Sequence, residues 1–140
     1  MYQVVIDTGP LVALFDRKDK YHEWVLIQLK TISLPLLTCE AVIVETCFLV
    51  QKKEPSAVAQ IFTAIDNHFL QLSFVLSHEH NAIQKLMNKY SNVPMSLADA
   101  CIVRMSELFP QAKVLTLDSD FEVYRKHRNK VIPCIKPTLK

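Results

Sequence analysis

Short apolar runs alternate along the chain with longer segments in which apolar residues recur at helical spacing. Short apolar runs predict strands at residues 2–6, 35–38, 69–75, 113–117 and 130–135. Residues 35–38 could instead be an extended segment that leads into the next helix. Helical spacing predicts helices at residues 10–15, 20–32, 39–52, 55–66, 77–90, 96–108 and 120–127. Strands separated by helices favour a parallel sheet covered on both faces. Pro133 cannot donate to a neighbouring strand, so the last strand is expected at an edge.

Composition narrows the class of protein further. Half of the residues are hydrophobic and 21% are charged, which is typical of a globular protein. The chain has one glycine, Gly9, so neither form of Gly-rich phosphate loop can be present. No apolar run approaches the ~20 residues of a membrane helix, and the start MYQVVID lacks the basic region of a signal peptide. We therefore expect a single α/β domain over residues 1–140, without a membrane segment and located in the cytoplasm.

Cysteine and histidine spacing gives no metal motif. Cys39, Cys47, Cys101 and Cys134 include no C-x-x-C pair, and we expect them to be buried thiols. His78 and His80 would point to different sides of a helix, which disfavours a shared metal ion.

The small net charge of +2 hides an uneven distribution. Residues 123–140 contain six basic residues and no acidic one, so the remainder of the chain is net acidic. A basic segment of this kind either attracts a polyanion or forms a solvated, solubilising end. Charge alone does not decide between these two interpretations.

Two acidic residues directly follow predicted strands. Asp7 ends the run VVI, and Asp118 follows VLTL. Ligands of parallel α/β proteins bind beyond the carboxyl ends of the strands, which makes both residues candidates for a site. Each also has an ordinary explanation, because Asp is common at helix N-caps and in turns. Asp120, two residues later, could cap the next helix in the same way.

Two further acids have apolar surroundings. Glu45 lies within AVIVETCFLV, so its neighbours at helical spacing are apolar and we expect it on an apolar stripe rather than a solvent face. A buried carboxylate there would need a proton, a base or a cation. Asp99 lies in SLADACIV, where Ser96 and Asp99 also have the spacing of a capping box.

These four acids can meet at one edge of a parallel sheet. Four carboxylates cannot all remain ionised in one pocket without a compensating positive charge. Mg²⁺ or Mn²⁺ would supply that charge, because hard cations prefer oxygen ligands. A pair of such ions is a recurring solution for phosphodiester chemistry. The pattern therefore predicts a metal-dependent enzyme acting on phosphodiesters.

The four motifs VVIDTGPLVALF, AVIVET, SLADA and VLTLDSDF, in this order, resemble the PIN-domain ribonucleases, which include the VapC-type toxins of bacterial toxin–antitoxin pairs. The resemblance runs from Tyr2 to about Ile135. It implies a three-layer α/β/α sandwich around a mainly parallel sheet and Mg²⁺- or Mn²⁺-dependent endoribonuclease activity. It also implies an RNA substrate, a small antitoxin as partner and a homodimer, for which the apolar helices around 39–65 offer a surface.

By this resemblance Asp7, Glu45, Asp99 and Asp118 are the catalytic, metal-binding acids. Asp120 falls where many members have a further acid, so it is a fifth candidate ligand. Thr8 and Thr116 match hydroxyl residues that would support the ligands.

The basic segment then has a role in binding RNA. Arg125, Lys126 and Arg128 would contact the RNA backbone. Phe121 and Tyr124 are expected to pack in the core rather than stack on a base, and Arg17, Lys18 and Lys20 form either an opposite rim or a solvated loop.

Three alternatives remain open at this stage. A phosphatase with an aspartyl nucleophile commonly has D-x-D after its first strand, whereas Asp7 is followed by Thr8 and Gly9. A non-catalytic RNA- or partner-binding module would keep the basic segment but tolerate neutralised acids. A housekeeping RNA-processing nuclease would have the same site and no antitoxin.

Overall fold

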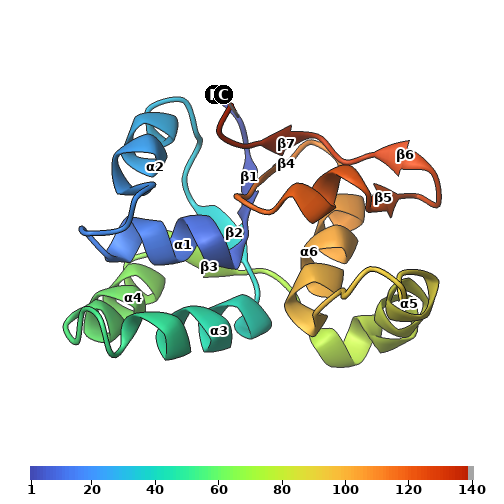
Figure 1. The fold of residues 1–140 in the computed structure, drawn as a ribbon, viewed down its shortest axis with the longest axis horizontal. Coiled ribbons are helices and arrows are strands. Elements are labelled where there is room, and N and C mark those ends of the chain that lie inside the picture. The colour runs from blue at the N-terminus through green and yellow to red at the C-terminus, as the bar shows by residue number, and fades with distance from the viewer. Residues whose placement is uncertain (139–140) are drawn as a thin grey trace.

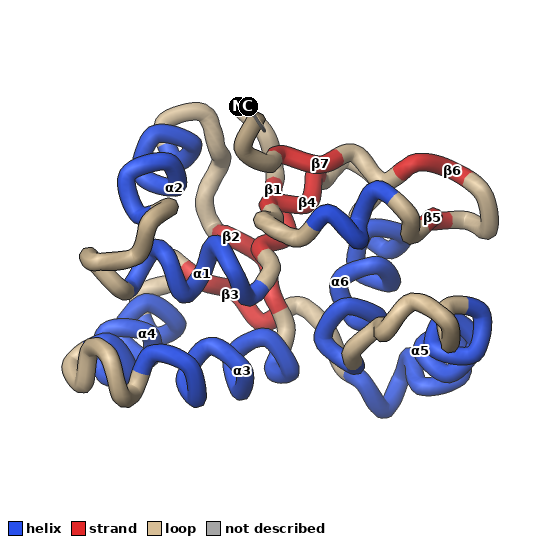
Figure 2. Tube along the Cα trace, viewed as in Figure 1, coloured by secondary structure: helices blue, strands red, loops and turns tan. Residues whose placement is uncertain are grey.

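A five-stranded sheet, parallel at every pairing, runs through the middle of the computed structural model, which describes residues 1–138. The strands are short and their residues in the centre are fully buried, as at Val4, Val5 and Ile6. In order across the sheet they are β3 (Leu70–Leu72), β2 (Leu36–Thr38), β1 (Val4–Ile6), β4 (Lys113–Leu115) and β7 (Cys134–Ile135). Figure 2 shows these strands gathered between the helices, which confirms the expected α/β fold.

Helices cover both faces of the sheet (Figure 1). From β1 to β3 the chain moves in one direction across the sheet, so right-handed connections place the intervening helices on one face. The connection from β3 back to β4 runs the other way and places its helices on the opposite face. The first group is α1 (Thr8–Phe15), α2 (His22–Leu29), α3 (Glu40–Val50) and α4 (Ala57–Asp66). The second group is α5 (Leu76–Lys89) and α6 (Leu97–Leu108).

Helix α6 packs between the sheet and α5 and is buried on most sides. Its N-terminus is a capping box, in which Asp99 N–H donates to Ser96 Oγ (3.0 Å) and Ser96 N–H donates to Asp99 Oδ2 (3.3 Å). This confirms the capping predicted from the spacing of the two residues. The cap fixes where the first turn of α6, and with it Asp99, lies.

The segment after β4 differs from the sequence prediction. The helix expected over 120–127 is wrong beyond its first turn, because a 3₁₀ helix, η1 (Ser119–Glu122), ends there. The amide of Arg125, which would have continued the helix, donates instead to Tyr90 Oη (2.8 Å). The chain then forms a hairpin of β5 (Arg125–Lys126) and β6 (Lys130–Val131).

The strand expected over 130–135 is divided into two. Residues 130–131 belong to the hairpin, and β7 forms the edge of the main sheet. Pro133 lies between them, and its carbonyl oxygen accepts a hydrogen bond from Val114 N–H (2.8 Å). Because Pro133 has no N–H of its own, it can accept this bond from β4 but cannot donate a hydrogen bond to a strand on its other side. The predicted edge position of this strand is confirmed.

The hairpin turn has two residues in the left-handed region, His127 (φ 47°) and Arg128 (φ 75°). Contacts from both neighbouring helices hold this turn. His127 N–H donates to Glu107 Oε2, and the carbonyl oxygen of Arg128 accepts from Lys89 Nζ. Most of the basic segment is therefore an ordered hairpin packed on α5 and α6, while Lys140, its last base, lies outside the described residues.

Other expectations are met in part. No helix within residues 1–138 combines the length and apolar character needed to cross a membrane. Cys39 and Cys101 are buried free thiols, as predicted, whereas Cys47 and Cys134 are only half-buried. His78 is exposed near the start of α5.

Candidate functional site

A cavity of about 430 Å³ lies where the strand order reverses, beyond the carboxyl ends of β1 and β4. The connections from these adjacent strands lead to opposite faces of the sheet, which leaves a crevice between them. Three helices also reach the cavity, namely α1, α3 and α6. The lining residues are Asp7, Thr8, Gly9, Glu45, Leu49, Ser96, Asp99, Leu117 and Asp118.

Asp7 is the most buried acid of the cavity, at 5% exposure. It occupies the N-cap position of α1, but its side chain makes no capping hydrogen bond. Instead Asp7 Oδ2 accepts from Thr116 Oγ1 (2.7 Å). Burial raises the pKa of Asp7 to about 6, the bond from Thr116 opposes that rise, and the nearby Asp99 and Asp118 add to it. Capping of α1 therefore does not explain why an aspartate is present at position 7.

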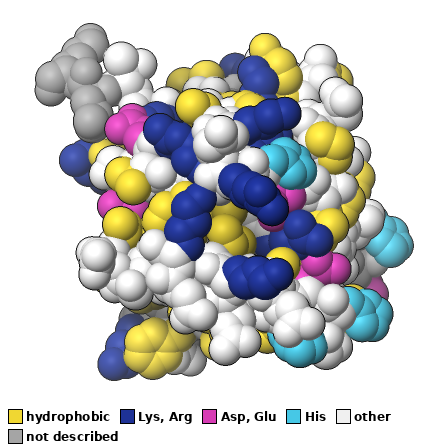
Figure 3. All heavy atoms as spheres, turned by 90° about the vertical axis from the view of Figure 1, so that its right-hand side faces the viewer, with side chains coloured by type: hydrophobic (Ala, Val, Ile, Leu, Met, Phe, Trp, Pro, Cys, Tyr) yellow, Lys and Arg dark blue, Asp and Glu magenta, His cyan; other side chains and the backbone are white. Residues whose placement is uncertain are grey.

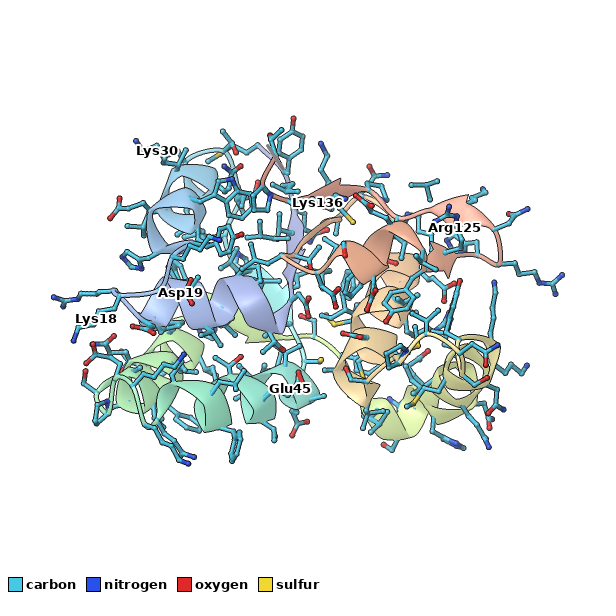
Figure 4. The ribbon with its side chains drawn as sticks, viewed as in Figure 1. Lys18, Asp19, Lys30, Glu45, Arg125 and Lys136 are labelled. Atoms are coloured by element: carbon cyan, nitrogen blue, oxygen red, sulfur yellow. The ribbon has the colours of Figure 1, made fainter. Side chains whose placement is uncertain are left out.

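Glu45 reaches the cavity from α3. Thr8 Oγ1 donates to Glu45 Oε1 (2.9 Å) and so ties α3 to the start of α1. Figure 4 shows Glu45 on the part of α3 nearest α6. The expectation that Glu45 lies on a buried apolar stripe is wrong in part, because Phe48 and Leu49 are 65% and 48% exposed. α3 packs on the molecule through its buried residues Val42, Ile43, Thr46 and Val50.

Asp99 has two roles in the geometry. Besides the capping box, its Oδ2 accepts a hydrogen bond from Tyr124 Oη (3.0 Å). Desolvation raises the pKa of Asp99, and the negative charge of Asp118 adds to the rise. The hydrogen bonds from Tyr124 and Ser96 oppose it by favouring the charged form. Capping and cavity lining are thus compatible in one side chain.

Asp118 and Asp120 do not have equivalent positions. Asp118 lines the cavity, and its Oδ1 accepts from Asp120 N–H (2.8 Å). Asp118 N–H in turn donates to Thr116 Oγ1 (3.0 Å). Asp120 contributes this backbone amide, while its carboxyl group is not among the groups that line the cavity. The structure therefore brings four of the five predicted acids together.

The four acids share one arrangement: in each, a donor from elsewhere in the local structure holds a carboxylate oxygen. Oxygen lone pairs on every acid stay available for a further ligand. The carboxylates repel one another in a partly dehydrated space, as the raised pKa values of Asp7 and Asp99 show. Such a set of oxygens is suited to bind a hard cation.

Gly9 allows the two walls of the cavity to approach closely. A Cβ at this position would lie 3.3 Å from Cβ and Cδ1 of Leu117, which is tighter than ordinary contact. Leu117 directly precedes Asp118, while Gly9 follows Thr8. The one glycine of the chain thus lies where α1 meets the loop after β4.

The three residues predicted to bind RNA have different environments. Arg125 Nη1 donates to the carbonyl oxygens of Glu122, Val123 and Tyr124, and so closes the end of η1. Lys126 is largely buried, at 8% exposure. Arg128 is exposed at the hairpin turn. Of the three, only Arg128 is therefore exposed.

Sequence reasoning missed two lysines on α5, the helix that contacts the hairpin turn through Lys89. Lys85 and Lys89 are exposed on α5, one turn apart, and Lys89 contacts the carbonyl of Arg128. Figure 3 shows Lys and Arg side chains gathered on this side of the molecule. We call Lys85, Lys89, Arg128 and Lys130 the basic face. The signal in the sequence was that Lys85 and Lys89 are four positions apart, which places them on the same side of a helix.

Sequence reasoning also missed the hydroxyl of Tyr124. Tyr124 is fully buried, so its predicted place in the core is correct. A buried tyrosine hydroxyl nearly always has a hydrogen-bond partner, and here that partner is Asp99. The presence of Tyr rather than Phe at a core position was the available signal.

Comparison with known proteins relates this fold to a family. The sequence matches the PIN domain over residues 4–127. The structure is similar to the crystal structure of Mycobacterium tuberculosis VapC20, a sarcin-ricin loop cleaving toxin, with a TM-score of 0.74 and 17% identity over 86% of this chain and 94% of that chain. No curated protein sequence matches the chain significantly. Because the PIN domain match spans most of the chain, the protein belongs to the PIN domain family.

Proposed function

We propose that the protein is a Mg²⁺- or Mn²⁺-dependent endoribonuclease whose active site is the acidic cavity. The observation that carries this proposal is the convergence of Asp7, Glu45, Asp99 and Asp118 on one cavity at the reversal of strand order. Membership of the PIN domain family supports it, and so does the similarity to VapC20, a sarcin-ricin loop cleaving toxin.

The donor set fits a hard divalent cation. Every acidic group that lines the cavity offers carboxylate oxygens, the ligands that Mg²⁺ and Mn²⁺ prefer. Within residues 1–138, no group of three or more acidic, histidine or cysteine side chains is arranged so that together they could hold a metal ion. Mg²⁺ retains several water ligands and uses one or two carboxylates, so an open cluster of this kind suits it.

In the proposed site Asp7, Glu45, Asp99 and Asp118 would hold the ion. When bound, the ion would polarise a phosphoryl oxygen and make water more acidic. Thr116, Thr8 and Ser96 would orient the carboxylates through the hydrogen bonds described above. The cavity volume of about 430 Å³ is within the range that accommodates a nucleotide-sized group.

The RNA backbone would lie on the basic face. Phosphate contacts from exposed Lys and Arg position a nucleic acid without reading its sequence. Arg128 retains its predicted role in this proposal, with Lys85, Lys89 and Lys130 added. For Arg125 and Lys126 we propose that they mainly shape the hairpin, since one is engaged by carbonyl groups and the other is buried.

The proposed biological role is that of a toxin acting in the cytoplasm and controlled by a small antitoxin. The proposed oligomer is a homodimer formed through an apolar face on α3 and α4. We define this face as Val44, Phe48 and Leu49 of α3 with Phe62 of α4, which are exposed by 48–69%. An exposed apolar group of this size is typical of a protein-binding surface.

Cleavage of a mixed RNA pool in Mg²⁺ or Mn²⁺ tests the nuclease proposal. Wild-type protein should cut, EDTA should stop it, and Asp99→Asn should fold but not cut, because asparagine retains the cap and removes the charge. Asp66→Asn, an exposed acid at the end of α4, is the matched control and should cut normally.

Two results would contradict the proposal. If Asp99→Asn and the wild type cut equally, the cavity is not the active site. If neither cuts a pool that includes structured ribosomal and transfer RNA, yet both bind it equally, the protein is an RNA-binding module.

A further inference from the structure

Tyr124 lies in the core and contacts Asp99, one of the acids that line the cavity. It follows η1 directly before β5, and α6 and β5 are in contact (Figure 1). Its ring makes edge-to-face contacts with Tyr90 and Phe121, each with ring centroids 5.1 Å apart. The side chain is completely buried. Packing on two sides therefore leaves the position of the Tyr124 hydroxyl little freedom.

That hydroxyl is directed at one oxygen of one acid. Tyr124 Oη donates to Asp99 Oδ2 at 3.0 Å, and Ser96 N–H donates to the same oxygen at 3.3 Å. Two donors that approach Oδ2 from different segments restrict rotation of the carboxylate about its Cβ–Cγ bond. They also leave Oδ1 of Asp99 available for a further ligand.

The hydroxyl is not required for packing alone. Phenylalanine would keep the ring and both edge-to-face contacts, as Phe121 does beside it. Asp99 would also keep its cap, because the capping box is formed by Ser96. The tyrosine thus has one contact that phenylalanine lacks, and this contact is with an acid of the cavity.

We propose that Tyr124 is a positioning residue, which holds Asp99 in the orientation that binds the divalent cation. This inference rests on the proposed function, since it assumes that Asp99 is a ligand. Groups that hydrogen-bond to metal ligands fix the orientation of the ligand, and their loss typically costs about 10- to 100-fold in metal affinity. Tyr124 would act through Asp99 and would touch neither the ion nor the RNA.

The test compares Mn²⁺ binding by the full-length wild type, Tyr124→Phe and Tyr90→Phe. Binding is measured directly by the loss of the electron paramagnetic resonance signal of free Mn²⁺, without RNA. Tyr90→Phe is the matched control, because it also removes a hydroxyl from this aromatic cluster. The hydroxyl of Tyr90 accepts a hydrogen bond from the amide of Arg125 and makes none with Asp99. We expect about tenfold weaker Mn²⁺ binding for Tyr124→Phe and an unchanged affinity for Tyr90→Phe.

Thermal unfolding of the metal-free proteins accompanies the titration. A Tyr124→Phe variant that binds Mn²⁺ like the wild type overturns the inference. So does an equal loss of affinity in both phenylalanine variants, because the hydroxyls would then act on packing alone.

Asp99→Asn separates this inference from the proposed function. If Asp99→Asn binds Mn²⁺ as tightly as the wild type, the ion does not bind at Asp99 and the proposed metal site itself fails. If Asp99→Asn loses binding while Tyr124→Phe retains it, only the role of Tyr124 fails.

Discussion

Thr116 Oγ1 donates to Asp7 Oδ2 across 2.7 Å, although the two residues are 109 positions apart in the sequence. The same hydroxyl oxygen accepts a hydrogen bond from Asp118 N–H. One hydroxyl therefore joins the acid after β1 to the acid after β4, at the point where the strand order reverses.

Thr116→Val should weaken both folding and ion binding. Thr116 is fully buried, so the substitution leaves Asp7 Oδ2 and Asp118 N–H without this partner in a dehydrated place. We expect a loss of about 2 kcal/mol in the free energy of unfolding and about tenfold weaker Mn²⁺ binding. Denaturant unfolding and Mn²⁺ titration measure the two effects.

Two control variants accompany Thr116→Val. Thr116→Ser keeps the hydroxyl and should bind Mn²⁺ normally. Thr38→Val removes a buried hydroxyl that bonds to the carbonyl of Ile6, and it should lose stability only. Weaker ion binding in Thr38→Val would show that general destabilisation explains the effect.

The stability of the metal-free protein should fall as the pH rises from 4 to 7. The pKa of Asp7 is raised from 3.8 to about 6 by burial, so the folded state binds the proton more tightly than the unfolded state. The resulting stabilisation is complete below about pH 4 and is lost as the pH rises through about 6, a change of about 3 kcal/mol. Asp7→Asn should remove this contribution.

Thermal unfolding in EDTA tests this expectation. At pH 7.5 Asp7→Asn should unfold at a higher temperature than the wild type, and at pH 4.5 the two should differ little. A difference of the same size at both pH values would mean that ionisation of Asp7 is not its cause.

Two glutamates on α3 should differ sharply in activity. Glu45→Gln removes a charge from the cavity and should lower RNA cleavage by at least 100-fold, because the other acids cannot replace a proposed ligand. Glu40→Gln changes an exposed residue in the first turn of the same helix and should cut normally. Single-turnover cleavage rates at saturating Mn²⁺ measure the difference, and equal rates would remove Glu45 from the site.

Neutralising the basic face should reduce the salt dependence of RNA binding. The double variant Lys89→Gln/Arg128→Gln should show a shallower slope of log affinity against log salt concentration. The magnitude of the slope should fall by about 0.7 to 0.9 for each phosphate that the protein no longer neutralises. Lys30→Gln is the control, because Lys30 is exposed and Figure 4 shows it at the end of α2, on the opposite side of the molecule from Arg125 and the hairpin. Filter binding by Asp99→Asn protein measures affinity without cleavage. The same slope in all variants would place the RNA elsewhere.

Phe48→Glu should weaken self-association without unfolding the protein. Phe48 is 65% exposed, so its replacement costs little in the monomer but introduces a charge into the proposed dimer contact. We expect a dissociation constant at least about tenfold higher by sedimentation equilibrium. Ile27→Glu changes an equally apolar residue, 56% exposed on α2, and should leave association unchanged. Equal behaviour of the two variants would argue against the α3–α4 face.

The sequence predicted the fold class and most elements because strands and helices have distinct apolar spacing. It also placed Asp7 and Asp118 at strand ends, where a parallel sheet collects ligands. It could not predict the hairpin, since the amide of Arg125 leaves the helix to donate a hydrogen bond to the hydroxyl oxygen of Tyr90, 35 positions away in the sequence. Periodicity records only local preference, and this tertiary bond overrides it.

Glu45 shows a different limit of sequence reasoning. Its apolar neighbours suggested burial, but α3 is apolar on more than one side and only one side packs on the molecule. An apolar residue on a protein-binding surface looks the same in the sequence as one in the core. The partner of the Tyr124 hydroxyl was equally invisible, because Asp99 lies 25 positions away on another element.

The spread of the acids along the chain has a consequence during synthesis. Asp7 leaves the ribosome more than a hundred residues before Thr116 and Asp118. β1 lies between β2 and β4, so the cavity does not exist until β4 has paired with β1. Such non-local pairing comes late and slowly in folding. A chain that has not yet been synthesised as far as β4 therefore lacks the assembled cavity.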